Sequence, residues 1–252
     1  MKTKYYIADP SGNITALVIT AFDRNAKSVA KKIMSKNNSI EQVGFVDFAD
    51  GNIKLRMSGN EFCGNATMSA AALYYKLTKK QGRYETAVSV LGNESPVKVA
   101  VAKMHGYYDC ECELDWPVKI ETIEFEAQNN KYKYPIIHFE GISHIIADEN
   151  LGESVAQNVI KRIAREHSLK ALGIMLLSSN KLYMKPLVYV TGVNTLFFEN
   201  SCASGTCAVS AVYGSEKGIS LSQPGGVISA INSDKIKLFG KVKLSKCYSE
   251  EI

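Results

Sequence analysis

Short apolar runs alternate along the chain with longer amphipathic stretches. Residues 14–19, 43–48 and 97–101 are rich in β-branched and aromatic side chains and lie between turn residues, a pattern typical of strands. Residues 23–35 and 151–167 place apolar side chains on one face with polar residues between them, which predicts two amphipathic helices. The chain is therefore expected to combine helices and strands in an α+β fold.

Polar and glycine-containing segments punctuate these elements. Residues 92–93 predict one turn, and residues 224–226 predict another. Residues 128–133 are polar and precede Pro135, so we expect a surface loop there. The Trp116-Pro117 pair marks the expected position of a domain boundary.

Two segments of the chain, residues 58–74 and 199–213, echo each other. When Cys63 is aligned with Cys202, the same offset carries the similarity through the following helix and into later strands. The matching pairs are Thr67 with Thr206, Ala72 with Ala211, Tyr74 with Tyr213, Val88 with Val227, Val97 with Ile236 and Val99 with Leu238. The repeat predicts two structurally similar halves, although small residues in helices also match by chance.

Each cysteine of this pair lies in a turn of small and polar residues, directly before a helix that is rich in small residues and poor in charge. Such a helix is expected in a core. The N–H groups and dipole of its first turn favour an anion there, and they lower the pKa of a nearby thiol from about 8.5. A pair of buried structural cysteines is the competing interpretation.

Two such thiols could act on opposite faces of one carbon. If both helices begin at one cleft, their N–H groups can hold a substrate carboxylate with a sulfur on either side of the adjacent carbon. One thiolate then removes a proton while the opposite thiol delivers one, which inverts the carbon. The N–H groups stabilise the enolate-like charge, and a dry cleft is needed because an α-hydrogen is a weak acid.

The stretches that carry these cysteines, residues 57–66 and 199–206, resemble the paired cysteine motifs of the diaminopimelate epimerase superfamily. Residues 10–13 resemble its N-terminal glycine–asparagine turn and residues 223–226 its late glycine turn, so the resemblance spans almost the whole chain. It implies two pseudo-two-fold-related domains, each a curved mixed sheet wrapped around a central helix, with the active site in the cleft between them. It also implies racemase or epimerase chemistry without pyridoxal phosphate or another cofactor.

The resemblance further implies domain limits and residue roles. The N-terminal half would comprise residues 1–117, completed by a C-terminal strand at about 241–252, and the C-terminal half residues 118–240. Cys63 and Cys202 would be the catalytic acid–base pair. The residues expected to bind substrate are Asn13, Glu41, Gly64, Asn65, Glu199, Ala203, Ser204 and Gly205, with Thr67 and Thr206 as further candidates. Among them, Glu199 would receive the substrate ammonium.

The chain departs from diaminopimelate epimerases at several points. The loop before Cys63 is shorter, a glutamate–arginine pair is here Glu199-Asn200, and a glycine-asparagine-proline-histidine turn is replaced by residues 141–144. The missing groups hold the distal end of diaminopimelate, so a single amino acid is the expected substrate. Residues 41–45, 58–69 and 199–202 look most like those of the histidine racemases that supply D-histidine for opine-type metallophores. This resemblance gives Glu41 the role of binding an imidazole N–H.

Other activities stay open at this point. The resemblance also allows a diaminopimelate epimerase, a racemase of another amino acid, or a member of the fold that uses different residues for its chemistry. A redox protein is a further alternative, although the chain has no Cys-x-x-Cys motif. Of the other cysteines, Cys110, Cys112 and Cys247 are expected to be small buried hydrophobes and Cys207 a core residue. His144 is expected to be a structural histidine.

Composition narrows the class of protein without identifying a site. The net charge of +5 is spread along the chain, which argues against a nucleic-acid partner. No apolar run approaches the ~20 residues that cross a bilayer, and the N-terminus lacks a secretory signal pattern, so we expect a cytoplasmic protein with no membrane partner. The scattered histidines and cysteines indicate no metal site. A small-molecule amino acid is the expected partner, and a homodimer is compatible with the sequence.

Overall fold

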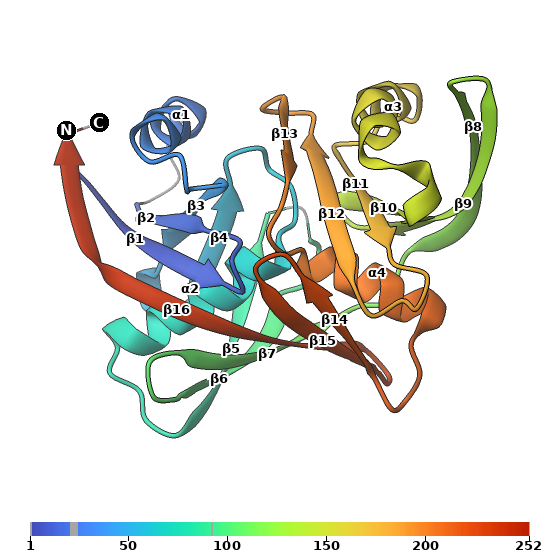
Figure 1. The fold of residues 1–252 in the computed structure, drawn as a ribbon. Helices are drawn as coiled ribbons and strands as arrows, with labels where there is room; N and C mark the ends of the chain where they lie inside the picture. The colour runs from blue at the N-terminus through green and yellow to red at the C-terminus, as the bar shows by residue number, and fades with distance from the viewer. Residues whose placement is uncertain (1, 21–24, 92, 252) are drawn as a thin grey trace.

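The computed structural model describes residues 2–20, 25–91 and 93–251 (Figure 1). Its helices are α1 (Ala26–Lys36), α2 (Gly64–Leu77), α3 (Glu153–Glu166) and α4 (Ala203–Tyr213), with short 3-10 turns at Ala49–Gly51 and Glu149–Leu151. Its strands are β1 (Lys2–Pro10), β2 (Thr15–Ile19), β3 (Gln42–Asp47), β4 (Ile53–Met57), β5 (Arg83–Val90), β6 (Val97–Lys103), β7 (Tyr108–Leu114), β8 (Lys119–Ala127), β9 (Asn130–Phe139), β10 (Ile142–Asp148), β11 (Ala171–Leu177), β12 (Met184–Val190), β13 (Thr195–Phe198), β14 (Ile219–Gln223), β15 (Gly226–Asn232) and β16 (Ile236–Glu251).

The larger of the two sheets closes on itself. Its ten strands follow the order β1-β2-β3-β4-β5-β6-β7-β16-β15-β14, and β1 pairs with β16 as well as with β2. The length of β16 makes this closure possible, because its first part pairs with β7 and its second part with β1. Figure 1 shows β16 running across the molecule until it ends beside the N-terminus.

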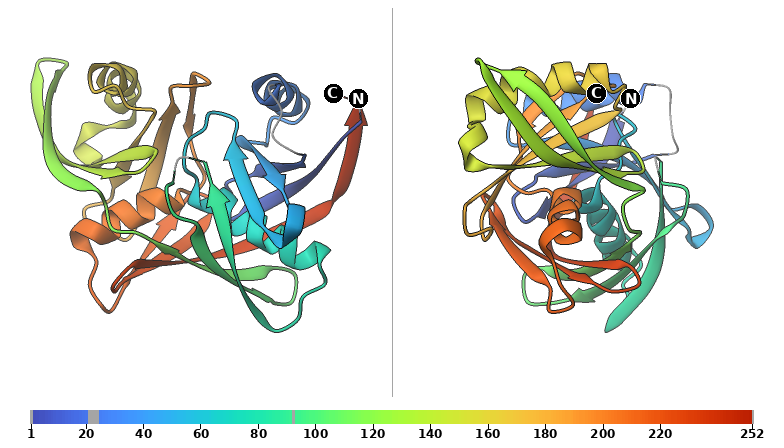
Figure 2. Two further views of the ribbon diagram at one scale, coloured as in Figure 1. Left: turned by 180° about the vertical axis from the view of Figure 1, so that it is seen from behind. Right: turned by 90° about the vertical axis from the view of Figure 1, so that its right-hand side faces the viewer.

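Helix α2 is enclosed by this sheet. It contacts β1, β2, β4, β5, β6, β7 and β16, and the views of Figure 2 show strands on several sides of it. Residues 64–73 and Tyr75 are buried, as expected of a helix without a charged face. Its alanines, such as Ala70 and Ala71, are fully buried and let the surrounding strands approach the helix closely.

The smaller sheet has the order β13-β12-β11-β10-β9-β8, and its strands β10 and β11 are parallel. Helix α3 packs on β11 and β12 through its apolar face, which includes Val159, Ile160 and Ile163. Helix α4 contacts β10 of this sheet and β14, β15 and β16 of the larger one, and it also contacts α2. The two buried helices α2 and α4 therefore meet where the two sheets meet.

Most of the elements expected from the sequence are present, and the α+β class is confirmed. The three expected strands correspond to β2, β3 and β6, and the two expected helices to α1 and α3. The helix expected from residue 23 begins at Ala26; residues 23 and 24, like Gly92 of one expected turn, lie outside the described residues. The turn at 224–226 joins β14 to β15.

The prediction of a surface loop at residues 128–133 is wrong. Only Gln128 and Asn129 form the turn between β8 and β9, with φ values of 49° and 62°. Both lie in the left-handed region that a tight two-residue hairpin turn requires. The polar residues that follow belong to β9 and form ion pairs across the exposed hairpin, for example Lys133 with Glu124. Their polarity reflects exposure of a strand rather than absence of one.

The expected domain limits stay predictions. Strands β8 to β13 form a sheet of their own, whereas β14, β15 and the start of β16 are hydrogen-bonded into the larger sheet through β7. The last part of β16 pairs with β1 from Val242 to Glu251, which is the region expected to complete the N-terminal half. None of the helices in the described part of the chain is long and apolar enough to cross a membrane.

Candidate active site

Cys63 and Cys202 each occupy the N-cap position of a buried helix. Cys63 precedes α2 with φ −140° and ψ 107°, and Cys202 precedes α4 with φ −133° and ψ 111°. Each sulfur accepts a hydrogen bond from the backbone N–H three residues later, at 3.4 Å from Ala66 and at 3.4 Å from Gly205. The sulfur thus takes the place that a serine or aspartate oxygen commonly takes in a helix cap.

The threonines at matching positions also behave alike. Thr67 Oγ1 donates to the Cys63 carbonyl at 2.8 Å, and Thr206 Oγ1 donates to the Cys202 carbonyl at 2.9 Å. These bonds hold each cysteine at the start of its helix and engage both hydroxyls as donors. The repeated sequence therefore produces two helix starts of the same local geometry.

The two helix starts contact each other. A Cβ added to Gly64 would lie 2.9 Å from the Cβ of Ala203, closer than such atoms approach, so glycine is what permits this packing. Asn65 of α2 reaches across the contact, and its Nδ2 donates to the Ser201 carbonyl at 3.0 Å. The first turns of both helices, with the cysteine before each, therefore face one small region.

Different side chains surround the two thiols. Gln42 of β3 lies against Cys63, with its Nε2 3.3 Å and its Oε1 3.4 Å from the sulfur. Ser204 Oγ lies 3.6 Å from the Cys202 sulfur and 2.9 Å from Nε2 of the buried His144. The similarity of the two helix starts thus does not extend to the side chains that surround the sulfurs, because each thiol has its own set of polar neighbours.

A cavity of about 20 Å³ is lined by both cysteines and by the first residues of both helices. It has room for about one water molecule. It adjoins a cleft of about 550 Å³, and the residues that line both spaces are Gln42, Glu61, Val188, Val190 and Glu199. A cleft of this volume is sufficient for a small organic ligand, and the cavity that the thiols line lies beside it.

Three carboxyl groups, those of Glu41, Glu61 and Glu199, line this cleft. Burial is the main cause that raises the pKa of each, to about 7 for Glu41 and Glu61 and to about 8 for Glu199. Repulsion from the other two glutamates raises the pKa of Glu199 further, while its contacts with the Cys202 thiol and the Asn13 amide lower it. A cationic ligand would favour the ionised form of all three groups.

The pKa values of the thiols differ from the expectation based on the helix dipole. Burial raises the pKa of Cys63 to about 12 and that of Cys202 well above its ordinary value, and the charge of Glu199 adds to both. The N–H groups of Ala66 and Gly205 do lower the two pKa values, but burial outweighs them. The expectation of a lowered thiol pKa is therefore wrong.

Comparison with known proteins identifies the family to which this chain belongs. A family model described as the histidine racemase CntK N-terminal domain matches residues 2–246. A histidine racemase of Fusobacterium nucleatum subsp. nucleatum is 33% identical, over 94% of this chain and 91% of the relative. A histidine racemase of Staphylococcus aureus (strain Mu50) is 31% identical, over 87% of this chain and 85% of the relative. The chain belongs to the histidine racemase family.

Solved structures of other enzymes share the fold. A protein described as a predicted epimerase from Pseudomonas aeruginosa is similar with a TM-score of 0.69 at 10% identity, over 98% of this chain and 99% of that one. A hydroxyproline epimerase from Agrobacterium vitis, solved with bound trans-4-hydroxy-L-proline, gives 0.67 at 7% identity, over 98% and 92%. At these identities the likeness concerns the fold alone.

In this histidine racemase family member, the residues expected at the site lie close together. Asn13 is buried and its Nδ2 donates to Glu41 at 3.1 Å, and Glu41 also accepts from the side chain and backbone N–H of Asn200. Asn65 Oδ1 is buried and has no hydrogen-bond partner among the described residues. Asn13 and Glu41 thus form one hydrogen-bonded group, in which Glu41 lines the larger cleft, and Asn65 lines the small cavity beside the thiols.

Three side chains that shape the site were not predicted from the sequence. Gln42, Glu61 and Gln223 all lie within the motifs that carried the family resemblance, but no spacing rule gave them a role. Gln223 Oε1 accepts the backbone N–H of Cys202 at 2.7 Å. His144 is structural in that its Nε2 faces Ser204, yet its Nδ1 is buried without a partner among the described residues. Burial lowers the pKa of His144 to about 3, so its imidazole is neutral.

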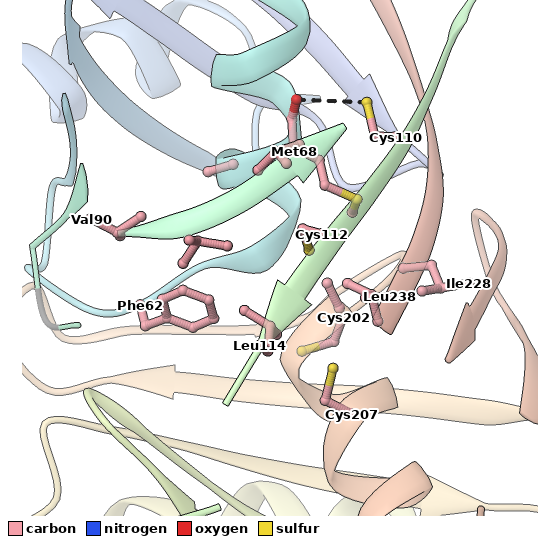
Figure 3. Close-up of a cluster of buried hydrophobic side chains, with 14 of the residues drawn as sticks. Phe62, Met68, Val90, Cys110, Cys112, Leu114, Cys202, Cys207, Ile228 and Leu238 are labelled. Carbon is pink, nitrogen blue, oxygen red and sulfur yellow. Dashed lines mark hydrogen bonds between the residues drawn. The ribbon is translucent and has the colours of Figure 1, made fainter. Parts of the chain in front are cut away.

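The other four cysteines differ from Cys63 and Cys202 in their surroundings. Cys110, Cys112 and Cys207 are buried as expected, and Figure 3 shows them with Cys202 in one cluster of apolar side chains. The expectation for Cys247 is wrong, because it is exposed on the last part of β16. Among the described residues, no three His, Cys, Asp or Glu side chains are arranged to hold a metal ion.

Proposed function

We propose that this protein is a histidine racemase that interconverts L- and D-histidine with Cys63 and Cys202 as a two-base pair and with no cofactor. The observation that carries the proposal is the pair of cysteine-capped helix starts, which line one cavity with both sulfurs. Membership of the histidine racemase family supports the substrate. The wider fold would then consist of two halves related by a pseudo-two-fold axis, each built around its enclosed helix.

Substrate binding would use the backbone of both helices. The first-turn N–H groups of α2 at Gly64 and Asn65, and those of α4 at Ala203, Ser204 and Gly205, line the cavity or lie beside it. Such first-turn N–H groups have no backbone carbonyl partner within their helix and favour a carboxylate. Two helix starts acting on one carboxylate would fix the α-carbon between the sulfurs. They would also stabilise the negative charge that builds on the carboxylate as the α-proton leaves.

The chemical step moves one proton from substrate to protein and one from protein to substrate. One thiolate takes the α-proton, and the opposite thiol gives its proton to the other face of the carbon, so that the protein ends with the two roles exchanged. Burial and Glu199 raise both thiol pKa values, which disfavours the thiolate. The substrate ammonium beside Glu199 would offset that repulsion and favour the thiolate when substrate is bound.

The 550 Å³ cleft would hold the substrate side chain. Glu41 lines it, and its carboxyl is held by Asn13 and Asn200 in a position where one oxygen accepts a single hydrogen bond from the protein. A remaining lone pair of that oxygen makes Glu41 one candidate acceptor for an imidazole N–H. We also propose that the protein acts in the cytoplasm, that its D-histidine supplies a metallophore pathway, and that two copies form a homodimer.

The direct test is a substrate panel. Purified protein is incubated separately with L-histidine, L-alanine, L-glutamate and diaminopimelate, and the products are resolved by chiral chromatography. We expect D-histidine to form fastest, without added pyridoxal phosphate and in the presence of a chelator. Faster conversion of diaminopimelate, or a requirement for pyridoxal phosphate, would overturn the proposal.

A further inference from the structure

One carboxyl oxygen in the wall of the site is buried without a hydrogen-bond partner. Glu61 is 6% exposed, and its Oε2 has no partner among the described residues. It comes two residues before Cys63, and it lines both the cavity beside the thiols and the larger cleft. Leaving a buried acceptor unpaired costs free energy, so a donor that arrives with the substrate would restore what the fold leaves unsatisfied.

The surroundings of Glu61 hold its carboxyl in this wall. The backbone N–H groups of Gly59 and of Glu61 itself face the carboxyl and favour its ionised form. A Cβ added to Gly59 would lie 2.5 Å from Glu61 Oε2 and 2.5 Å from Val190 Cγ1. Because Gly59 has no side chain, the Glu61 carboxyl fits between the Gly59 backbone and Val190 of β12. The carboxyl is therefore held in this wall and is not free to turn to solvent.

The other two carboxyl groups of the cleft are already engaged. Glu41 accepts hydrogen bonds from Asn13 and from two N–H groups of Asn200. Glu199 lies against the Cys202 thiol and the Asn13 amide, in the position proposed for the substrate ammonium. Of the three, Glu61 alone has a buried oxygen with no partner among the described residues.

We propose that Glu61 accepts a hydrogen bond from an imidazole N–H of the substrate and is the main determinant that selects histidine over side chains of the same shape. This inference rests on the proposed function, because it takes the α-carbon to lie between the thiols. From there the side chain must leave the 20 Å³ cavity through the wall that it shares with the cleft, and Glu61 lines that wall. A site built to accept an N–H rejects an analogue that lacks it, since the acceptor is then left unpaired.

The test compares histidine with β-(2-thienyl)alanine, whose ring is similar in size but has no N–H. The kcat/KM for each is measured for the wild type, Glu61→Gln, Glu61→Asp and Glu41→Gln, with the exposed Glu216→Gln as matched control. We expect the wild type to prefer histidine, and Glu61→Gln to reduce that preference by about ten- to a hundredfold. Glu61→Asp should retain part of it, and Glu41→Gln should reduce it by less than Glu61→Gln does.

The outcomes separate this inference from the function on which it rests. Racemisation of no amino acid by the wild type would overturn the proposed function. Racemisation of histidine with an unchanged preference in Glu61→Gln would overturn the role of Glu61 alone. If Glu61→Gln does not fold, the wild type still decides, because equal kcat/KM for histidine and thienylalanine would show that no ring N–H is recognised.

Discussion

The two cysteine-capped helix starts share a backbone design but differ in what surrounds each sulfur. Both sulfurs accept an N–H at 3.4 Å, and both threonine hydroxyls bond back to the cysteine carbonyl. Cys63 then faces the amide of Gln42 and is partly exposed, whereas Cys202 faces Ser204 and is 5% exposed. In the proposed mechanism the shared part would provide two equivalent bases for one carbon, and the different parts would give each thiol its own proton affinity.

Thermodynamics limits how the different surroundings of the two thiols can appear in the kinetics. The enantiomers of an amino acid have equal free energies in water, so kcat/KM must be the same in both directions whatever the surroundings of each thiol. Asymmetry between Cys63 and Cys202 can therefore appear in kcat, in KM or in isotope effects for one direction. It cancels in the ratio kcat/KM. Variants are best judged by how both directions change together.

Removing either thiol should have the largest effect. Cys63→Ser and Cys202→Ser each replace a thiol by an alcohol that is a far poorer acid and base, so we expect each to lower kcat/KM by at least about a thousandfold in both directions. The rate of histidine racemisation, followed by circular dichroism, checks this. Substantial turnover in either variant would contradict the need for two thiols.

Glu199→Gln should have the next largest effect on activity, and it should change activity and stability in opposite directions. Loss of the partner for the substrate ammonium should lower kcat/KM by about ten- to a hundredfold. Because burial raises the folded-state pKa of Glu199 to about 8 from its ordinary 4.5, the wild type loses stability as pH rises from 4.5 through 8. The variant should therefore be more stable at pH 9, by an amount on the order of a few kcal/mol.

Thermal unfolding at pH 4 and pH 9 provides the measurement for Glu199. The two proteins should unfold at similar temperatures at pH 4, where the carboxyl is protonated in both states, and differ at pH 9. The ratio of the wild-type kcat/KM to the variant kcat/KM should also rise as the pH increases through about 8. Titration of the substrate histidine cancels in this ratio because it affects both proteins alike. A variant that is less stable than wild type at pH 9 would contradict this account of the carboxyl.

The neighbours that differ between the two thiols should have smaller effects. Gln42→Ala removes the amide beside Cys63, and Ser204→Ala removes the hydroxyl beside Cys202. Each hydrogen bond is worth about 1 kcal/mol, so we expect a loss of about fivefold in kcat/KM for each. Solvent isotope effects measured in both directions should change differently in the two variants. Identical changes would indicate that these neighbours do not set the difference between the thiols.

Cys207→Ala should have the smallest effect on activity. Cys207 lies on α4 only a short distance after Cys202, but it packs among apolar side chains (Figure 3). We expect its removal to cost about 1 kcal/mol of stability and to leave racemisation within about twofold of the wild type. A loss comparable with that of Cys202→Ser would mean that the helix as a whole, rather than the capping thiol, carries the effect.

The sequence predicted the two helix starts better than the side chains around them. Cys63 and Cys202 were recognisable because a repeat placed both at helix starts, and local sequence determines a helix cap. Gln42 reaches the Cys63 thiol and Gln223 reaches the Cys202 backbone N–H from other strands, so their contacts depend on tertiary packing that no local pattern contains. The thiol pKa values were mispredicted for the same reason, since burial outweighs the helix start. Cys247 was mispredicted because residue type alone does not show which face of an edge strand is exposed.

The most direct test of two opposed thiols is the position of the label when L-histidine is racemised in deuterium oxide. In the two-thiol mechanism the product would receive its α-hydrogen from the opposite thiol, which has exchanged with solvent, while returned substrate would regain the proton just removed. Early in the reaction, mass spectrometry of the separated enantiomers should therefore show deuterium in D-histidine and almost none in residual L-histidine. Early label at similar levels in both enantiomers, or product that retains its original proton, would contradict the two-thiol mechanism.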